Sequence, residues 1–227
     1  MDIYLHPFPN DRNKAIERAK EFLAGNPLFL DTETTGLDND SEICEIAIIE
    51  ADGNVLLNTL VKPMQMIPAA ATEIHHITNA MVASYPTLAE LMPKLEQILR
   101  GREVLVYNSE FDEGMLGQSA RLGHCEFSEA NPGWWYSFRD GNFPGTETPW
   151  YRSYWHCVMK LYAKFYGDWN DFHGNYRWIP LSRATMQCGL QLPKDIHRAY
   201  ADAELTRRIV LFMAEQKVEP IQEQDGG

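Results

Sequence analysis

The 227-residue sequence has no long apolar run and little positive charge. No stretch reaches the roughly 18 apolar residues that a membrane-spanning helix needs, so we expect no membrane contact. The N-terminal segment MDIYLHPFPNDRNKAIERAK is interrupted by polar residues and prolines where a signal peptide would have an apolar core. Four widely spaced cysteines form no CxxC pair, which favours free buried thiols in a reducing compartment. We therefore expect a cytoplasmic protein.

Basic residues are also scarce, with 20 Lys and Arg against 32 Asp and Glu. The resulting net charge of −12 argues against a protein that coats nucleic acid through its overall electrostatics. It does not exclude a nucleic-acid enzyme, because an acidic cluster that holds divalent cations adds negative charge where a phosphate must bind.

The apolar pattern that is present predicts one α/β domain with a mixed sheet covered by helices. Buried strands are expected at residues 28–34, 43–50, 55–61 and 103–107, and helices at 10–24, 87–100, 109–123, 155–167, 180–190 and 200–216, with two short helical turns in 68–82. Thr87 is a plausible N-cap of the second helix.

Three parts are expected along the chain: an N-terminal helical extension at 1–27, the main domain at 28–214 and a flexible tail at 215–227. Within the domain, residues 126–154 are rich in Gly, Pro and aromatic residues and show no clean period. We interpret them as a structured insertion, since a disordered linker would hardly carry so many Trp and Tyr. Around Trp134, Trp135 and Tyr136 it forms either a local satellite core or a platform on which bases stack.

The first strand ends in two acids, Asp31 and Glu33. Alternation along a strand places both on one face, with Thr32 on the other. The pair is either a solvated strand end or part of a functional site. Asp112 follows Ser109 by three residues, so it either closes a capping box or completes a cation site beside the first strand.

His197 and Asp202 stand near the start of the last helix. Five residues apart on one helix, they would not share a face. If they cooperate, His197 must precede the helix and Asp202 must lie in its first turns. The alternative is an Asp that favours the helix dipole and an incidental surface histidine.

Together, the four carboxylates Asp31, Glu33, Asp112 and Asp202 form a set of oxygen ligands that favours Mg²⁺ or Mn²⁺ over zinc. Two such ions can activate water and stabilise the leaving oxygen in phosphodiester cleavage. The sequence therefore predicts a two-metal site with His197 beside it.

Three segments, DTETTGL, NSEFD and HRAYAD, resemble in order the motifs of the DnaQ-like 3′–5′ exonucleases, in the DEDDh branch with an HxAxxD third motif. That branch includes polymerase III epsilon-type proofreading subunits, RNase T and Trex-type nucleases. EIHHIT is similar to the family's IHGIT segment, with His76 in place of glycine, which we expect either to narrow the substrate pocket or to give it another use. The resemblance covers residues 28–212 and implies an RNase H-like fold with a five-stranded mixed sheet flanked by helices.

The resemblance also implies roles. The four carboxylates would hold two Mg²⁺ or Mn²⁺ ions, and His197 would be the general base. The terminal nucleotide would contact Thr34, Leu37, Ile74, His75, Asn108 and Phe111.

The products would be nucleoside 5′-monophosphates released from 3′ ends. The acidic charge favours single-stranded DNA ends. RNase T-like trimming of RNA, degradation of oligonucleotides, and a non-catalytic binding or structural subunit of a polymerase or defence complex remain alternatives. A homodimer through the 10–24 helix is a further expectation from the family.

Overall fold

The computed structural model describes residues 7–123, 125 and 154–218. Residues 126–153, which make up nearly all of the predicted insertion, and residues 219–227 of the predicted tail lie outside this part. Among the described residues, no helix is both long enough and apolar enough to cross a membrane.

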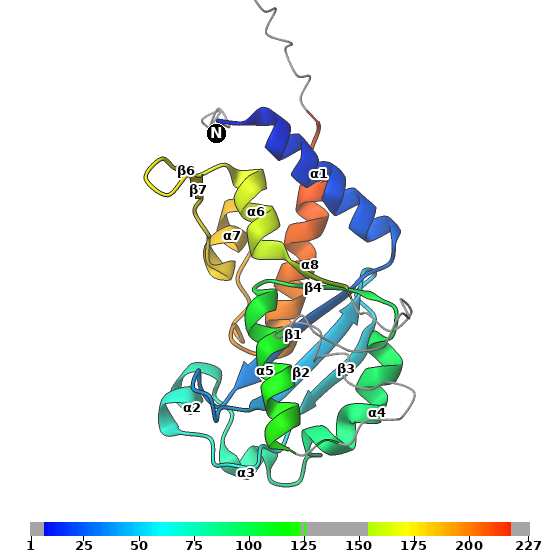
Figure 1. The fold of residues 1–227 in the computed structure, drawn as a ribbon, viewed down its shortest axis with the longest axis vertical. Helices are drawn as coiled ribbons and strands as arrows, with labels where there is room; N and C mark the ends of the chain where they lie inside the picture. Colours follow the sequence, from blue (N-terminus) through cyan, green and yellow to red (C-terminus); the bar gives the residue numbers. More distant parts are fainter. Residues whose placement is uncertain (1–6, 124, 126–153, 219–227) are drawn as a thin grey trace, which may run out of the picture.

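A five-stranded mixed sheet forms the centre of the fold (Figure 1). The strand order is β3-β2-β1-β4-β5, in which β1 pairs antiparallel with β2 and parallel with β4. The strands are β1 (Leu28–Thr34), β2 (Ile43–Glu50), β3 (Val55–Leu60), β4 (Glu103–Val106) and β5 (Tyr154–Cys157). The predicted sheet with flanking helices is therefore confirmed.

Helices cover both faces of the sheet. One face packs on α4 (Leu88–Leu99) and α5 (Ser109–Leu122). The other packs on α1 (Pro9–Ala24), α6 (Val158–Tyr166), α7 (Leu181–Gln187) and α8 (Ala199–Glu215). Two short helices, α2 (Ala69–His75) and α3 (Asn79–Val82), follow β3, and a small hairpin of β6 (Trp169–Asn170) and β7 (Asn175–Tyr176) projects beyond α6 (Figure 1).

The central strands are apolar because both of their faces are covered. Leu28, Phe29 and Leu30 of β1 are all fully buried, Phe29 toward α1 and α8 and its two neighbours toward α4 and α5. A strand buried on both faces reads as a continuous apolar run. This run ends at Asp31, so the acids of β1 lie where the strand leaves the core.

One predicted element was wrong. Residues 155–167 were expected to be a single helix, but Tyr154–Cys157 form β5, which pairs in parallel with β4 from Glu103↔Tyr154 to Val106↔Cys157. The helix α6 begins directly at Val158. A four-residue edge strand followed at once by a helix leaves no turn signal in the sequence, and its pairing with β4 is non-local.

Helix α1 is integrated into the core. Its apolar residues Ala15, Ile16, Ala19 and Phe22 are buried, and the helix packs against α6 and α8. The apolar face of α1 is thus used within the chain. A homodimer stays a prediction.

Candidate active site

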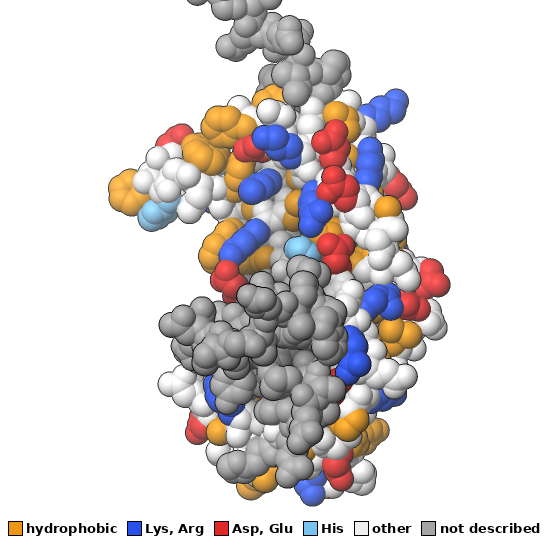
Figure 2. All heavy atoms as spheres, turned by 45° about the vertical axis from the view of Figure 1, so that its right-hand side comes forward, with side chains coloured by type: hydrophobic (Ala, Val, Ile, Leu, Met, Phe, Trp, Pro, Cys, Tyr) orange, Lys and Arg blue, Asp and Glu red, His pale blue; other side chains and the backbone are white. Residues whose placement is uncertain are grey.

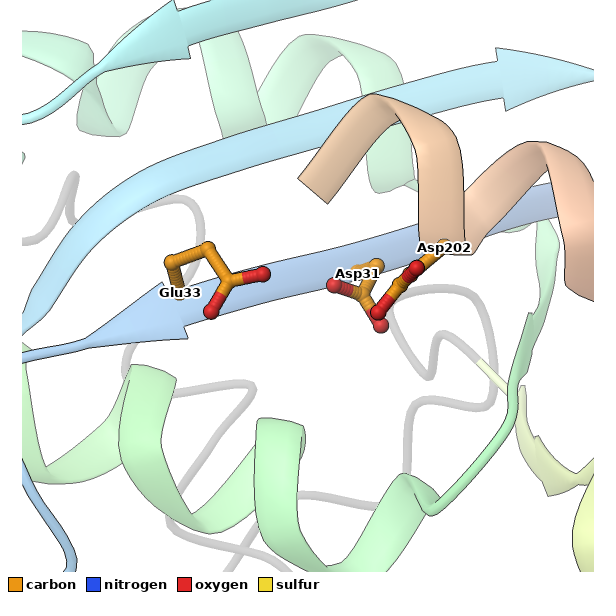
Figure 3. Close-up of side chains that lie close together, drawn as sticks. All are labelled: Asp31, Glu33 and Asp202. Atoms are coloured by element: carbon orange, nitrogen blue, oxygen red, sulfur yellow. The ribbon is translucent and has the colours of Figure 1, made fainter. Parts of the chain in front are cut away.

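Three carboxylates meet at the end of β1. Asp31 and Glu33 project from β1 and Asp202 from the first turns of α8. One carboxylate oxygen from each residue lies within 4.8 Å of the other two. Figure 3 shows the carboxylates of Asp31 and Asp202 side by side, with Glu33 reaching in from farther along the strand. Carboxylates this close repel one another unless protons or a cation neutralise them.

The electrostatics of the cluster fit a divalent cation. Burial, together with the charges of Asp112 and Asp202, raises the pKa of Asp31 well above its usual range. Burial and the charge of Asp202 raise the pKa of Glu33 to about 8, and burial raises that of Asp202 to about 6. Such shifts indicate too little positive charge nearby. Oxygen ligands alone are the donor set that Mg²⁺ and Mn²⁺ prefer, so the residues present fit these ions.

Asp112 lies beside this cluster but is turned toward β1. The side chain is 4% exposed, and its Oδ1 accepts hydrogen bonds from the backbone N of Thr32 at 3.0 Å and from its Oγ1 at 2.7 Å. Burial raises the pKa of Asp112 to about 7 although these hydrogen bonds lower it. Asp112 is not one of the three clustered residues, but its charge is close enough to raise the pKa of Asp31.

The alternative of a capping box at this helix was wrong. The N-cap of α5 is Asn108, which makes no side-chain capping hydrogen bond, and Ser109 is the first helical residue. The carboxylate of Asp112 bonds to Thr32, 80 residues away, in place of a local backbone N–H. A tertiary contact has replaced the local one that the spacing suggested.

His197 precedes the last helix, as its cooperation with Asp202 required. The helix α8 begins at Ala199, and His197 has a left-handed φ of 65°. Its backbone N donates to Asp202 Oδ1 at 3.4 Å, and its Nδ1 lies 4.0 Å from Asp202 Oδ2. The side chain is 54% exposed, which leaves the imidazole open to solvent. A non-glycine residue in this conformation is strained, and such strain is frequent at functional sites.

A buried ion pair that sequence reasoning missed supports the start of α8. Glu45 lies opposite Glu33 on β2, and its side chain is 4% exposed. It accepts from Arg198 Nε at 3.0 Å, from the second guanidinium nitrogen of Arg198, and from the backbone N of Ala199 at 2.9 Å. Because Arg198 follows His197 directly, this pair holds the residues beside the cluster. A lone Glu inside the apolar run ICEIAIIE was the available signal.

A pocket of about 420 Å³ adjoins the carboxylates. Glu33 and Thr34 line it from β1, and Leu37 and Ile74, which are 82% and 58% exposed, lie at its walls. Its lining includes five of the six residues predicted to contact substrate, namely Thr34, Leu37, Ile74, His75 and Phe111. The sixth, Asn108, is exposed at the N-cap of α5 and is not among the lining residues.

The two adjacent histidines differ in surroundings. His75 is 2% exposed, and its Nδ1 accepts from the backbone N of Ile77 at 3.0 Å. Burial lowers the pKa of His75, so the ring is a neutral part of the pocket wall. His76 is exposed and caps α2 with a left-handed φ of 61°, the conformation for which glycine is favoured. Since His76 does not line the pocket, the expectation that it narrows the pocket was wrong.

The raised pKa values predict how stability depends on pH. Protons bind these carboxylates more tightly in the folded than in the unfolded protein, so the stabilisation is full near pH 4 and is lost as the pH rises through about 6 to 8. We expect the Tm of the metal-free protein to fall from pH 5 to pH 9. Mg²⁺ at 100 times its Kd should restore about 2.7 kcal/mol at the alkaline end. Calorimetry in EDTA and in Mg²⁺ would measure both effects, and a Tm that rises with pH in EDTA would contradict the assignment.

Comparisons with known proteins agree with this arrangement. A model of the exonuclease family RNase_T matches residues 28–210. The uncharacterized exonuclease CP81 of Escherichia phage 186 is 35% identical over 198 residues, which cover 87% of this chain and 93% of that protein.

Two solved structures share the fold. One, of a 3′-exonuclease with a histone mRNA stem-loop, has a TM-score of 0.62 at 14% identity over 84% of this chain and 64% of that one. The other, of Exonuclease X with 5′ overhanging duplex DNA, has a TM-score of 0.51 at 21% identity, and the match covers 84% of this chain and 94% of that one. The predicted RNase H-like fold is thereby confirmed. With a family model matched over residues 28–210 and a phage exonuclease similar over nearly its whole length, the chain belongs to the exonuclease family.

Proposed function

We propose that the protein is a DEDDh-type, metal-dependent 3′–5′ exonuclease that removes nucleoside 5′-monophosphates from the ends of single-stranded DNA. The observation that carries this proposal is the pocket of about 420 Å³ that opens directly beside the clustered carboxylates. A pocket next to the cluster can hold one terminal nucleoside while its phosphate lies at the acids.

The roles of the acids follow from their positions. Asp31, Glu33 and Asp202 would hold the ions directly, and Asp112 would join them by its second carboxylate oxygen. When bound, two divalent cations supply an activated water and neutralise the charge on the leaving oxygen. Thr32 orients Asp112 through two hydrogen bonds, and Glu45 with Arg198 holds the start of α8, which carries Asp202.

His197 is suited to take up a proton. Its side chain is exposed at the edge of the cluster, and Asp202 lies 4.0 Å from its Nδ1. Imidazole is the side chain most often used as a general base, and a neighbouring carboxylate stabilises the imidazolium that forms. We therefore assign His197 as the general base.

The pocket would bind the terminal nucleoside through contacts of two kinds. Leu37, Ile74 and Phe111 present apolar surface to a base, while the backbone around Thr34 lies beside the sugar. His75 supports the wall from behind, because it is buried and makes its hydrogen bond to the backbone of Ile77.

The proposal also names the substrate, single-stranded DNA. The net charge of −12 argues against a long electrostatic track along duplex DNA and therefore favours single-stranded ends. RNA is the second candidate, because a 3′-exonuclease of the same fold has been solved with a histone mRNA stem-loop. A non-catalytic binding module is disfavoured, since all four carboxylates and His197 are present.

A gel assay separates these candidates. Two single strands of identical sequence, one DNA and one RNA, are labelled at the 5′ end and incubated with the protein in Mn²⁺. We expect a ladder that shortens from the 3′ end on DNA, no cleavage in EDTA, and recovery when Mg²⁺ or Mn²⁺ is added in excess. A ladder on RNA alone would move the assignment to RNA trimming. Cleavage in EDTA would overturn the metal-dependent mechanism.

A further inference from the structure

The segment between β7 and α7 is anchored just beyond the end of β4, the strand beside β1. The register of β1 and β4 pairs Phe29 with Leu105, so Tyr107 lies beside the end of β1 that carries Asp31. The hydroxyl of Tyr107 donates to the carbonyl O of Ile179 at 2.6 Å, and Ile179 is buried. The backbone at Ile179 is therefore anchored to the edge of the sheet where the acids lie.

Trp178 stands next to this anchor and is exposed. The side chain is 60% exposed, although indole is among the most costly groups to leave in water. The Nζ of Lys160, from the first turn of α6, lies over the indole ring at 5.8 Å from its centroid. Lys160 in turn contacts the carboxylate of Glu110 in the first turn of α5. These contacts place the ring beside the same helix turn that carries Phe111 and Asp112.

The first turn of α5 thus lies between two surfaces. On one side Phe111 lines the pocket proposed for the terminal nucleoside. On the other, Glu110 pairs with Lys160, whose Nζ lies over the exposed ring of Trp178. A strand whose last nucleoside fills the pocket must extend away from the carboxylates, and Trp178 offers it an exposed aromatic surface beyond the first turn of α5.

Base contacts are the natural source of affinity for such a strand. On the face drawn in Figure 2, the Lys and Arg side chains of the described residues are interspersed with Asp and Glu and form no continuous basic stripe. Near Trp178, Lys160 pairs with Glu110. Stacking on an aromatic ring is how proteins hold single strands without reading their sequence.

We propose that Trp178 stacks on a base at least two positions upstream of the cleaved nucleotide and holds the single strand during successive cleavages. This inference rests on the proposed exonuclease function and extends it to a second subsite. A dinucleotide is too short to use that subsite fully, whereas a 12-nucleotide strand fills both.

The test compares Trp178→Ala and Trp178→Phe with the wild type on a thymidine 12-mer and on a thymidine dinucleotide. We expect Trp178→Ala to raise KM for the 12-mer about 5- to 150-fold, the range of one lost stacking contact, with kcat nearly unchanged. The kcat/KM for the dinucleotide should stay within about twofold of wild type, and Trp178→Phe should retain most of the affinity because it keeps a ring. Phe172→Ala is the matched control, because Phe172 is 89% exposed on the β6–β7 hairpin and contacts His173.

Binding is measured separately by the fluorescence anisotropy of a labelled 12-mer in EDTA, which needs no catalysis. An unchanged KM and Kd in Trp178→Ala would overturn the inference while leaving the exonuclease function intact. An equal loss on the dinucleotide would overturn it too, because it would mean that the wall of the site had been damaged. A wild type that neither cleaves nor binds either strand would overturn the proposed function together with the subsite.

Discussion

Asp31→Asn is expected to lower exonuclease activity by about 10³-fold or more and, in EDTA at pH 8, to make the protein more stable. Asp31 has the central place in the carboxylate cluster, and metal ions contribute several kcal/mol of transition-state stabilisation, each 1.4 kcal/mol being tenfold in rate. The same side chain is half-buried beside Asp112 and Asp202, which raises its pKa and opposes folding at alkaline pH. Removing the charge relieves that repulsion.

Activity on a labelled 12-mer and thermal unfolding in EDTA would be measured on the same preparation. Each kcal/mol gained should raise Tm by about 2–4 °C in a protein of this size. Glu17→Gln is a suitable control, because Glu17 is an exposed acid on α1, and both quantities should stay at the wild-type level. Full activity in Asp31→Asn would refute the site, and a lower Tm in EDTA would refute its electrostatic description.

Arg198→Met is expected to be among the most destabilising single changes in the protein. It leaves Glu45, whose side chain is 4% exposed, without its cationic partner. Breaking a buried ion pair by removal of one partner costs about 3–5 kcal/mol, since the remaining charge stays buried. Glu45→Gln should cost less, because Arg198 is 33% exposed and can be hydrated.

The double variant Glu45→Gln/Arg198→Met completes a thermodynamic cycle. We expect it to be more stable than Arg198→Met alone, because the buried charge is gone. Urea unfolding in EDTA would give the free energies of unfolding of the wild type and of the three variants. If the double variant were the least stable of the three, packing of the Arg198 side chain, and not the charge pair, would hold the start of α8.

The central part of the fold could be predicted because it depends on local patterns. Continuous apolar runs predicted β1 and β2, and Thr87 does cap α4, where its Oγ1 accepts from the backbone N of Glu90. The edge strand β5 could not be predicted, since its pairing with β4 is non-local and α6 begins with no turn between them.

In the site too, local patterns were predictable and long-range contacts were not. The motifs pointed to four acids, of which the structure brings Asp31, Glu33 and Asp202 together, and alternation along β1 placed the first two on one face. The partners of the acids were not predictable. Thr32 bonds an aspartate 80 residues away, and Glu45 pairs with an arginine 153 residues away. No local pattern in the sequence indicates such pairs, so the supporting contacts of a site are the part that needs a structure.

The assembly of the site from opposite ends of the chain has a consequence for folding. Helix α8 brings Asp202 and His197 to β1 only after it docks on the sheet, and Glu45 meets Arg198 across 153 residues. Contacts of such long range form late, because a large loop must close before they stabilise anything. With the roles proposed for Asp202 and His197, a chain synthesised only as far as α7 would lack both residues and would not cleave. The order of the motifs along the chain would thus delay the proposed activity until α8 has been made and has docked.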